Sequence, residues 1–166
     1  MSDTAVGISQ SWRRGADGDM RRRRWIVGLS VFSCGMLGGI ALFQTGILKS
    51  LPDPPLRAFD ANAVHGSPEA YALLGTPDAL LGMASYGVTA CLAGMGAEDR
   101  SKHAKWIPLA MGAKALVDAV MAAQLGLKQA TKVHKYSIWS LLVLAATMAT
   151  LSLAMPETRR ALARSE

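Results

Sequence analysis

Four long apolar blocks limit what this sequence can fold into more than any other feature. They are Trp25–Leu48, Asp78–Gly96, Trp106–Leu127 and Tyr136–Met155. A helix needs about 20 apolar residues to cross the hydrocarbon of a bilayer. In lipid the backbone has to satisfy its own hydrogen bonds, so blocks of this length can only be helices. The sequence therefore predicts an all-α membrane protein, a bundle of four transmembrane helices within a domain over residues 21–158.

The two ends of the chain are polar. Residues 1–20 are rich in Gly, Ser and Asp and show no apolar period, so we expect a disordered cytoplasmic tail. Residues 159–166 are expected to form a second cytoplasmic tail. An arginine run, Arg21–Arg24, precedes the first block, but that block exceeds the ~7–15 residues of a signal-peptide core. We therefore expect an uncleaved membrane anchor.

Basic residues predict the orientation of the helices. With four spans, twelve flanking Lys and Arg residues lie on the side of both termini and five on the other side. The side richer in basic residues is normally cytoplasmic. We therefore expect a multi-pass protein of a bacterial-type inner membrane with both termini in the cytoplasm. The net charge of +6 reflects this topology and attraction to anionic lipid, and no nucleic-acid partner is expected.

The longest segment between blocks, residues 50–77, is expected outside the cytoplasm as a lid. Its start, Leu51–Pro55, cannot be helical because of its prolines. Two short amphipathic pieces follow, Leu56–Phe59 and Ala70–Leu74, which suit half-helices resting on the bundle. Ser67 and Thr76 each precede a proline, the pattern of an N-cap followed by proline at the first helical position.

Three motifs carry a resemblance to a known family. They are Val64-His65-Gly66-Ser67, then Tyr71–Gly82 with its Gly75-Thr76-Pro77 and the later Tyr86, and finally His134-Lys135-Tyr136-Ser137-Ile138. Over about residues 25–155 the sequence resembles the vitamin K epoxide reductase family. Members carry Cys-x-x-Val and a serine in the loop, then Gly-x-Pro-x-x-x-x-Gly and a tyrosine. Their last core helix begins with Cys-x-x-Cys.

The resemblance implies a bundle that holds a quinone near its outer surface, where a cysteine pair exchanges electrons with loop thiols. In this sequence His134 and Ser137 occupy the frame of that pair, and Ala61 that of the loop cysteine. Thiol–disulfide exchange needs a thiolate and a second, resolving thiol. The only cysteines, Cys34 and Cys91, lie inside apolar blocks, and we interpret them as packing residues.

We therefore expect no dithiol–quinone oxidoreductase activity. The pocket itself can survive the loss of the cysteines, so a quinone is the expected cofactor if there is one. The resemblance implies the following contacts to a quinone or another lipid: His134, Tyr136, Ser137, Tyr86 and Ser67.

Two charged residues, Lys114 and Asp118, lie near the middle of the third block, four residues apart and so on one helix face. Ionisable residues at this depth normally face a partner or the bundle interior. One alternative is a self-neutralising pair that fixes helix packing or marks a surface for another subunit. The other is a polar contact to a quinone head group, or part of a proton path.

The three histidines, His65, His103 and His134, are interpreted as solvated or interfacial, because their spacing matches no established metal site and no haem site is indicated. Small residues suggest close helix contacts, inside the bundle or with a neighbouring subunit: Gly35, Gly39, Gly82, Gly87, Ala90 and Gly94.

Two functions stay open at this point. The first is a redox-inactive relative that binds a quinone or similar lipid beneath the lid. The second is an accessory or structural subunit of a larger respiratory, photosynthetic or transport complex in the membrane.

Overall fold

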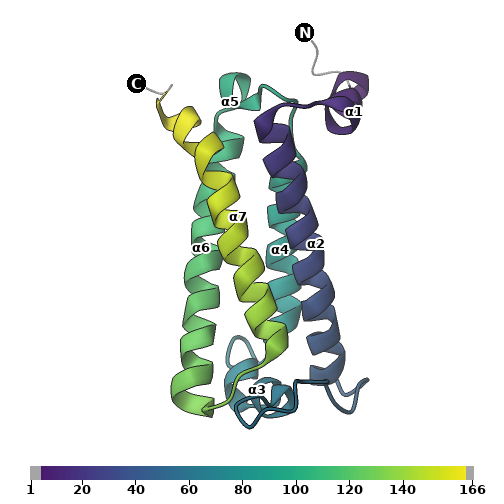
Figure 1. Ribbon diagram of the computed structural model, residues 1–166, viewed down its shortest axis with the longest axis vertical. Coiled ribbons are helices and arrows are strands. Elements are labelled where there is room, and N and C mark those ends of the chain that lie inside the picture. Colours follow the sequence, from purple (N-terminus) through teal and green to yellow (C-terminus); the bar gives the residue numbers. More distant parts are fainter. Residues whose placement is uncertain (1–4, 164–166) are drawn as a thin grey trace.

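Long helices lying side by side dominate the computed structural model, which describes residues 5–163 and contains no strand within them. These helices are α2 (Gly18–Gln44), α4 (Asp78–Gly94), α6 (Trp106–Lys128) and α7 (Ile138–Ala163) (Figure 1). Two shorter helices, α1 (Ala5–Arg14) and α5 (Arg100–His103), lie at the end where the described chain begins and finishes. We call this the termini end.

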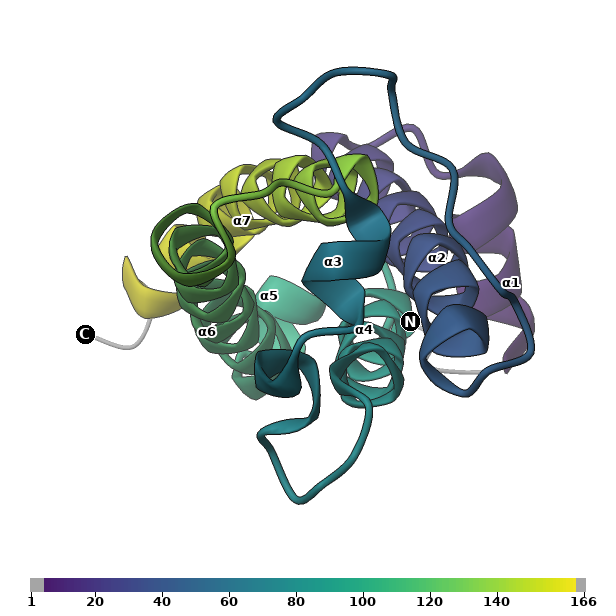
Figure 2. The same ribbon diagram turned by 90° about the horizontal axis from the view of Figure 1, so that it is seen from below.

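The opposite end, here called the loop end, is covered by the loop over residues 45–77. This loop contains α3 (Ala61–His65) and a short 3-10 helix, η1 (Pro68–Tyr71). Figure 2 shows α3 lying across the ends of the long helices. The sequence placed a helical piece at Leu56–Phe59, which is wrong. The helix forms at Ala61 instead because the carboxylate of Asp60 caps it, accepting a hydrogen bond from the N–H of Ala63 (2.9 Å).

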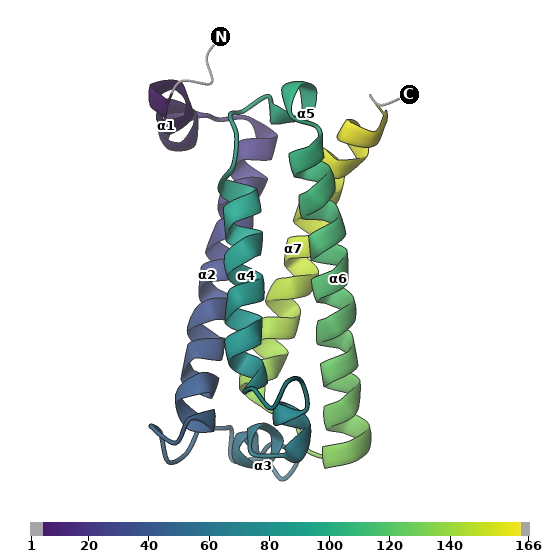
Figure 3. The same ribbon diagram turned by 180° about the vertical axis from the view of Figure 1, so that it is seen from behind.

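Three of the helices are long and apolar enough to cross a membrane: Gly18–Gln44, Ile138–Ala163, and α6 together with its π-helical continuation η2 (Gln129–Val133). This confirms a multi-pass helical membrane protein. The fourth, α4, has 17 residues and is about 25 Å long at 1.5 Å per residue. It packs between α2 and α6 (Figure 3), and its crossing of the bilayer stays a prediction.

The expected disorder of residues 1–20 is wrong where the structure describes them, because Ala5–Arg14 is helical. Arg24 on α2 stabilises the end of α1. Its guanidinium donates hydrogen bonds to the carbonyls of Trp12 (2.7 Å) and Gly15 (2.8 Å). The last carbonyls of a helix have no intrahelical donor, so a cation placed there favours the helix. Residues 1–4 lie outside the described part of the chain.

The expected end of the last helix at Met155 is also wrong, since α7 continues through Pro156 to Ala163. Proline removes one backbone donor and usually kinks a helix. Here the residues after it are held by α6. The Thr158 hydroxyl donates to the Pro108 carbonyl (2.9 Å), and Gly112 lies so close that an added Cβ would stand 2.4 Å from the Thr158 hydroxyl oxygen.

The interior contains two apolar clusters with polar residues between them. The cluster toward the termini end consists of Ile26, Ala93, Met111, Ala115 and Ala154. The cluster toward the loop end consists of Ile40, Ala41, Leu51, Ala61 and Ala79. The buried residues between these levels are largely polar: Ser30, Ser33, Tyr86, Thr89, Asp118, Thr147 and Thr150. We call this layer the polar waist.

The glycines that the sequence indicated as helix contacts divide into two groups. Gly39 and Gly82 are sealed inside, since an added Cβ would lie 2.7 Å from the Trp139 ring and 2.9 Å from Leu37. The second group, Gly35, Gly87 and Gly94, has open space at the Cβ position, as does Gly28, which the sequence analysis did not single out. Only the first group therefore contributes to packing within the chain.

Candidate functional site: a buried histidine with two serines

The 45–77 loop is fastened to the start of α7 by Asp53. Its carboxylate accepts hydrogen bonds from the N–H of Ala61 at the start of α3 and from that of Ile138 at the start of α7 (3.1 Å). The first N–H groups of a helix lack intrahelical partners, so one carboxylate here satisfies two helices. The Trp139 indole N–H also donates to the Pro52 carbonyl (2.8 Å). Asp53 thereby fixes α3 relative to α7.

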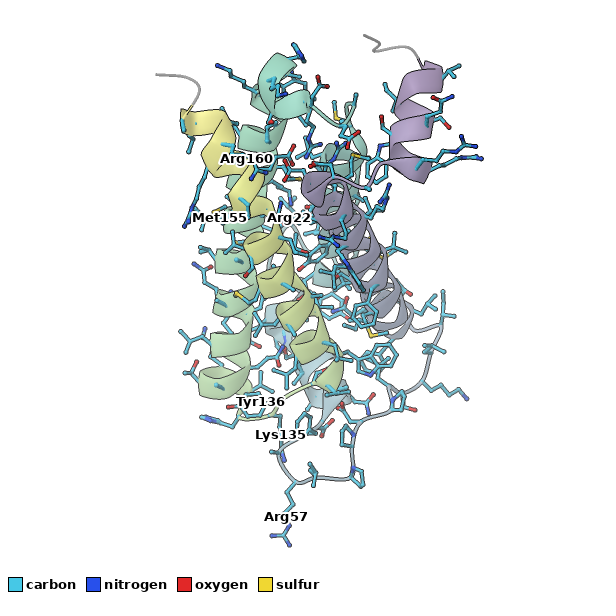
Figure 4. All side chains as sticks on the ribbon, turned by 45° about the horizontal axis from the view of Figure 1, so that its top comes forward. Arg22, Arg57, Lys135, Tyr136, Met155 and Arg160 are labelled. Carbon is cyan, nitrogen blue, oxygen red and sulfur yellow. The ribbon has the colours of Figure 1, made fainter. Side chains whose placement is uncertain are left out.

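A short backbone pairing beside it joins Tyr136 to the segment around Phe59. Hydrogen bonds of 2.9 Å flank the pair, and the two rings lie with centroids 6.4 Å apart. The Lys135 ammonium donates to the Arg57 carbonyl (2.6 Å). Figure 4 shows Tyr136 and Lys135 near the base of the loop and the Arg57 side chain pointing away from its tip. Residues 52–61 of the loop are thus held to the start of α7 and to the two residues that precede Ser137.

These contacts bury His65 against α7. The side chain of His65 is 5% exposed and Ser137 is 0% exposed. The His65 Nε2 atom lies 3.0 Å from the Ser137 Oγ and 3.3 Å from the Ser140 Oγ. The N–H of Ser137 donates to the Gln129 side-chain oxygen (3.4 Å). We call His65, Ser137 and Ser140 the histidine–serine site.

Burial lowers the pKa of His65 from its ordinary 6.5 to about 4. At neutral pH its imidazole is therefore uncharged, with one N–H donor and one acceptor nitrogen. Each serine hydroxyl donates one hydrogen bond and accepts others. The site is a neutral group of donors and acceptors that can exchange roles by rotating hydroxyls.

Gln44, at the end of α2, joins this site to the start of α4. Its amide N–H₂ donates to the Asp78 carboxylate (2.8 Å) and to the His65 carbonyl (3.4 Å). Its side-chain oxygen accepts from the N–H of Ala79 (3.3 Å), and the Tyr71 hydroxyl donates to its backbone carbonyl (3.0 Å). Three segments distant in the sequence therefore meet at the loop end.

Of the five residues expected to contact a ligand, only Ser137 lies in the histidine–serine site. His134 is exposed, with a left-handed φ of 54° that ends η2, and Tyr136 lies at the partly exposed edge. The Ser67 hydroxyl donates to the Val64 carbonyl within its own loop (2.9 Å). The expected set is therefore not one site.

Tyr86 is the most distant of the five. Its hydroxyl lies 2.5 Å from the Oγ1 of Thr147, in the polar waist. Thr147 lies about 15 Å further along α7 than Ser137, at 1.5 Å per residue. A single head group that contacts Ser137 does not reach Tyr86.

The residue that the sequence analysis missed is His65. Of the two interpretations, solvated or interfacial, its burial makes the solvated one wrong, and the interfacial one stays a prediction. A signal for it exists in the sequence. Asp60 is a good N-cap, and a helix starting there puts Ala61, Val64 and His65 on one face. All three are buried. The frame position of the loop cysteine, Ala61, thus lies on the same helix face as His65.

The two cysteines lie far from this site and do not pair with each other. The Cys34 thiol is 3.6 Å from the Met83 carbonyl, in the middle of α2. Cys91 is exposed on α4, about 12 Å further along that helix than Met83. The interpretation of both cysteines as packing residues is wrong for Cys91.

Lys114 and Asp118 form an ion pair (2.6 Å) within α6. Hydroxyl groups of α4 hydrogen-bond to this pair and so join the two helices. The Asp118 carboxylate also accepts from the hydroxyls of Ser85 (2.9 Å) and Thr89 (3.0 Å). This geometry matches the alternative in which the pair fixes helix packing. The side chain of Lys114 remains 22% exposed, and a contact to a ligand or subunit stays a prediction.

The termini end holds a second buried polar group, built on arginine. Arg100 is 2% exposed, and its guanidinium forms two hydrogen bonds to the Glu157 carboxylate (2.7 and 2.8 Å). It also donates to the carbonyls of Leu92 (2.7 Å) and Met95 (2.8 Å), at the end of α4. One of the flanking basic residues counted for the orientation is therefore buried and paired.

Arg23 completes the same helix end. It is 0% exposed and donates to four carbonyls at 2.7–2.9 Å, those of residues 93, 95, 96 and 97. The ring of Trp12 lies 4.9 Å from its guanidinium carbon. Two buried cations therefore satisfy the carbonyls of Leu92 and Ala93 in the last turn of α4 and those of the turn that follows it.

Histidines elsewhere do not add a metal centre to this picture. His103 lies exposed at the termini end beside Asp99 (3.1 Å). Within residues 5–163, His, Cys, Asp and Glu form no group of three or more that could hold a metal ion.

Comparison with known proteins agrees with this arrangement. No curated protein matches the chain significantly. The sequence profile described as the vitamin K epoxide reductase family matches residues 24–155. This range runs from the arginine run to the end of the apolar part of α7, and it includes the 45–77 loop with the histidine–serine site. The chain belongs to the vitamin K epoxide reductase family.

Proposed function

We propose that this protein is a redox-inactive member of its family that binds a quinone or a similar lipid head group at the histidine–serine site. The observation that carries the proposal is the 3.0 Å contact between His65 and Ser137. Ser137 occupies the position at which the family's Cys-x-x-Cys motif has its second cysteine. In this protein a hydrogen-bonded hydroxyl therefore replaces the reactive thiol at that position. The residues support a binding site in place of a reacting one.

The chemistry of the site suits a quinone ring. A quinone carbonyl needs a donor, and a quinol hydroxyl needs an acceptor. A neutral imidazole and two serine hydroxyls supply either without burying a net charge. Tyr136, at the exposed edge, and the apolar cluster of the loop end lie at the same end of the bundle, where they are available to pack against the ring and its tail.

The residues at the site give no support for thiol chemistry. A serine hydroxyl is not a thiolate and cannot attack or form a disulfide. Ala61 has no nucleophile, and its side chain is packed in the apolar cluster at the loop end. Cys34 and Cys91 are separated from each other and from the site, so they offer no substitute pair.

The proposal places the loop end outside and the termini end in the cytoplasm of a bacterial-type inner membrane. Both ends of the described chain lie at the termini end (Figure 1), and the arginine run lies there too. Because basic flanks are retained on the cytoplasmic side, this orientation follows from the charge distribution. α4 is then the fourth span, and the 45–77 loop is the lid.

A quinone-binding experiment tests the proposal with histidine controls that the chain itself provides. The protein in lipid nanodiscs is titrated with a short-chain benzoquinone, and binding is followed by quenching of tryptophan fluorescence. We expect His65→Ala to weaken binding by about five- to 150-fold, because one lost hydrogen bond in a buried site costs about 1–3 kcal/mol. His134→Ala, exposed at the same end, and His103→Ala, exposed at the other, should bind as the wild type does.

Equal binding by wild type and His65→Ala refutes this site, as does a loss confined to His134→Ala. Bound lipids extracted from the purified protein and identified by mass spectrometry give the natural ligand. The double variant Cys34→Ser/Cys91→Ser should keep full quinone binding. A dithiol-dependent quinone reduction that disappears in this variant contradicts redox inactivity.

A role as an accessory subunit is the second candidate, and the open glycines favour it. Gly87 and Gly94 leave space on α4 for the backbone of another helix, as do Gly28 and Gly35 on α2. In membranes such small residues allow close helix approach. Co-migration with a larger complex in mild detergent, lost in Gly87→Leu but kept in Gly28→Leu, would assign the interface to α4. Migration as a free protein in native membranes excludes this role.

A further inference from the structure

Two buried serines in the polar waist stand apart from all the contacts described so far. Ser30 and Ser33 are each 1% exposed, and neither hydroxyl has a hydrogen-bond partner among the described residues. Serines in helices commonly donate to the carbonyl four residues earlier. Ser152 does so on α7, with its hydroxyl 3.0 Å from the Met148 carbonyl. The hydroxyl oxygens of Ser30 and Ser33 are buried and make no such bond.

The helix register brings these serines level with the hydroxyls of two other helices. Gly82 on α4 contacts Leu37 on α2, and the two helices run in opposite directions. One turn from that contact toward the termini end, α2 reaches Ser33 and α4 reaches Tyr86. On α7, the Trp139 ring lies beside Gly39 of α2, which puts these two residues at the same level of the bundle. Thr147 follows about two turns further along α7, toward the termini end.

In the polar waist, the oxygens of Tyr86 and Thr147 can still accept hydrogen bonds, and the hydroxyls of Ser30 and Ser33 have no acceptor among the described residues. Thr147 donates its one hydroxyl proton to the Val143 carbonyl (2.7 Å). In the 2.5 Å contact between Tyr86 and Thr147, the tyrosine is therefore the donor. The oxygens of both residues can each still accept a hydrogen bond. Ser30 and Ser33 contribute two donors at the same level.

We propose that the polar waist is a binding site for an ordered water molecule held between α2, α4 and α7. Such a molecule accepts from Ser30 and Ser33 and donates to the oxygens of Tyr86 and Thr147. This uses its four hydrogen bonds, within the two to four that a buried water makes. The site is independent of the quinone proposal, because Tyr86 and Ser137 are about 15 Å apart along the bundle.

The physical reason is the cost of burying unpaired hydroxyls. A polar group taken into an apolar interior without a hydrogen bond destabilises the fold. Apolar layers close the waist on both sides, with Ile26 and Ala93 toward the termini end and Ile40 and Ala79 toward the loop end. A water that satisfies four groups at once removes this cost and ties three helices together.

Water-edited solid-state NMR of the protein in lipid nanodiscs tests the site directly. We expect rapid magnetisation transfer from water to Ser30 and Ser33. Ile26 and Ile40, buried one turn or more away on the same helix, should show none. Absence of transfer to both serines overturns the proposal, and this measurement on the wild type needs no variant to fold.

The thermal stability of serine variants gives a second test, because a bound water and unpaired hydroxyls shift Tm in opposite directions. If water is bound, Ser30→Ala and Ser33→Ala each lose a hydrogen bond and lower Tm by about 2–4 °C, the shift expected for about one lost bond in a chain of this size. If the hydroxyls are unpaired, the same changes raise Tm, which contradicts the site. Ser152→Ala, whose hydroxyl is exposed and bonded within its own helix, is the matched control and should leave Tm unchanged.

Discussion

The two ends of the bundle solve the burial of polar groups in opposite ways. At the loop end, His65, Ser137 and Ser140 form a neutral group whose hydrogen bonds can be rearranged. At the termini end, Arg23 and Arg100 meet fixed carbonyls and the Glu157 carboxylate. A charge-assisted network holds one geometry, whereas neutral hydroxyls and an imidazole can accept a new partner. The termini end is thus suited to hold the fold and the loop end to bind.

The largest expected effect is at the termini end. Arg100→Ala leaves Glu157 buried without its partner and should lower the free energy of unfolding by about 3–5 kcal/mol. Thermal unfolding in detergent, followed by circular dichroism, measures this loss. The double variant Arg100→Met/Glu157→Leu should recover most of it, because no lone charge remains. A double variant as unstable as Arg100→Ala would show that the contacts of Arg100 to the end of α4 outweigh the ion pair.

The loop end should instead show a dependence on pH. The pKa of His65 is about 4 in the folded protein and 6.5 in the ordinary, solvated state. Between these values the unfolded chain binds more protons, so stability is complete above pH 6.5 and decreases as the pH falls toward 4. The loss amounts to about 3 kcal/mol.

Chemical denaturation of wild type and His65→Gln across pH 4–7 isolates this contribution. The variant should lose the part of the slope due to His65, whereas His134→Gln, exposed at the same end, should keep it. Parallel curves for wild type and His65→Gln contradict the burial of a neutral imidazole.

A smaller effect tests the packing of α6 against α7 at the termini end. In Gly112→Ala the new methyl group would lie 2.4–2.6 Å from the Thr158 side chain, so α6 and α7 must separate. We expect a loss of about 1–3 kcal/mol in the free energy of unfolding, the usual cost of overpacking. Gly87→Ala, with open space around it, is the control and should be neutral or slightly stabilising. Similar Tm values for the two variants would contradict the close approach of α6 and α7.

The smallest expected effect is at the attachment of the loop. Asp53→Ala removes hydrogen bonds to the first residues of α3 and α7 and should cost about 1–2 kcal/mol, as the loss of a cap does. Amide hydrogen exchange should increase in residues 51–65 and leave α5 unchanged. Asp60→Ala, which uncaps α3 alone, should produce the increase without affecting Ile138. Unchanged exchange in Asp53→Ala would show that the loop is held by its other contacts.

The sequence predicted the elements more reliably than the site. The starts of α4 and α6 at Asp78 and Trp106 follow from where the apolar blocks begin. Burial of His65, Arg23 and Arg100 does not follow from periodicity, because a histidine in a loop and an arginine beside a helix look alike whether solvated or buried. Their surroundings come from segments far away in the chain: α7 for His65 and the end of α4 for the arginines. Ser137 was found only because the family frame marked its position.

Two neighbouring arginines of the run at residues 21–24 stabilise the ends of two different helices. Consecutive side chains on a helix point about 100° apart, so Arg23 reaches the end of α4 while Arg24 reaches the end of α1. Four lysines in their place would keep the charge that orients the chain in the membrane, but a lysine lacks the planar fork that contacts several carbonyls at once. The helix position and the chemical kind of each of these residues therefore matter beyond the sum of their charges. Arg23→Lys and Arg24→Lys would both leave the overall charge untouched, but the first would loosen the end of α4 and the second the end of α1.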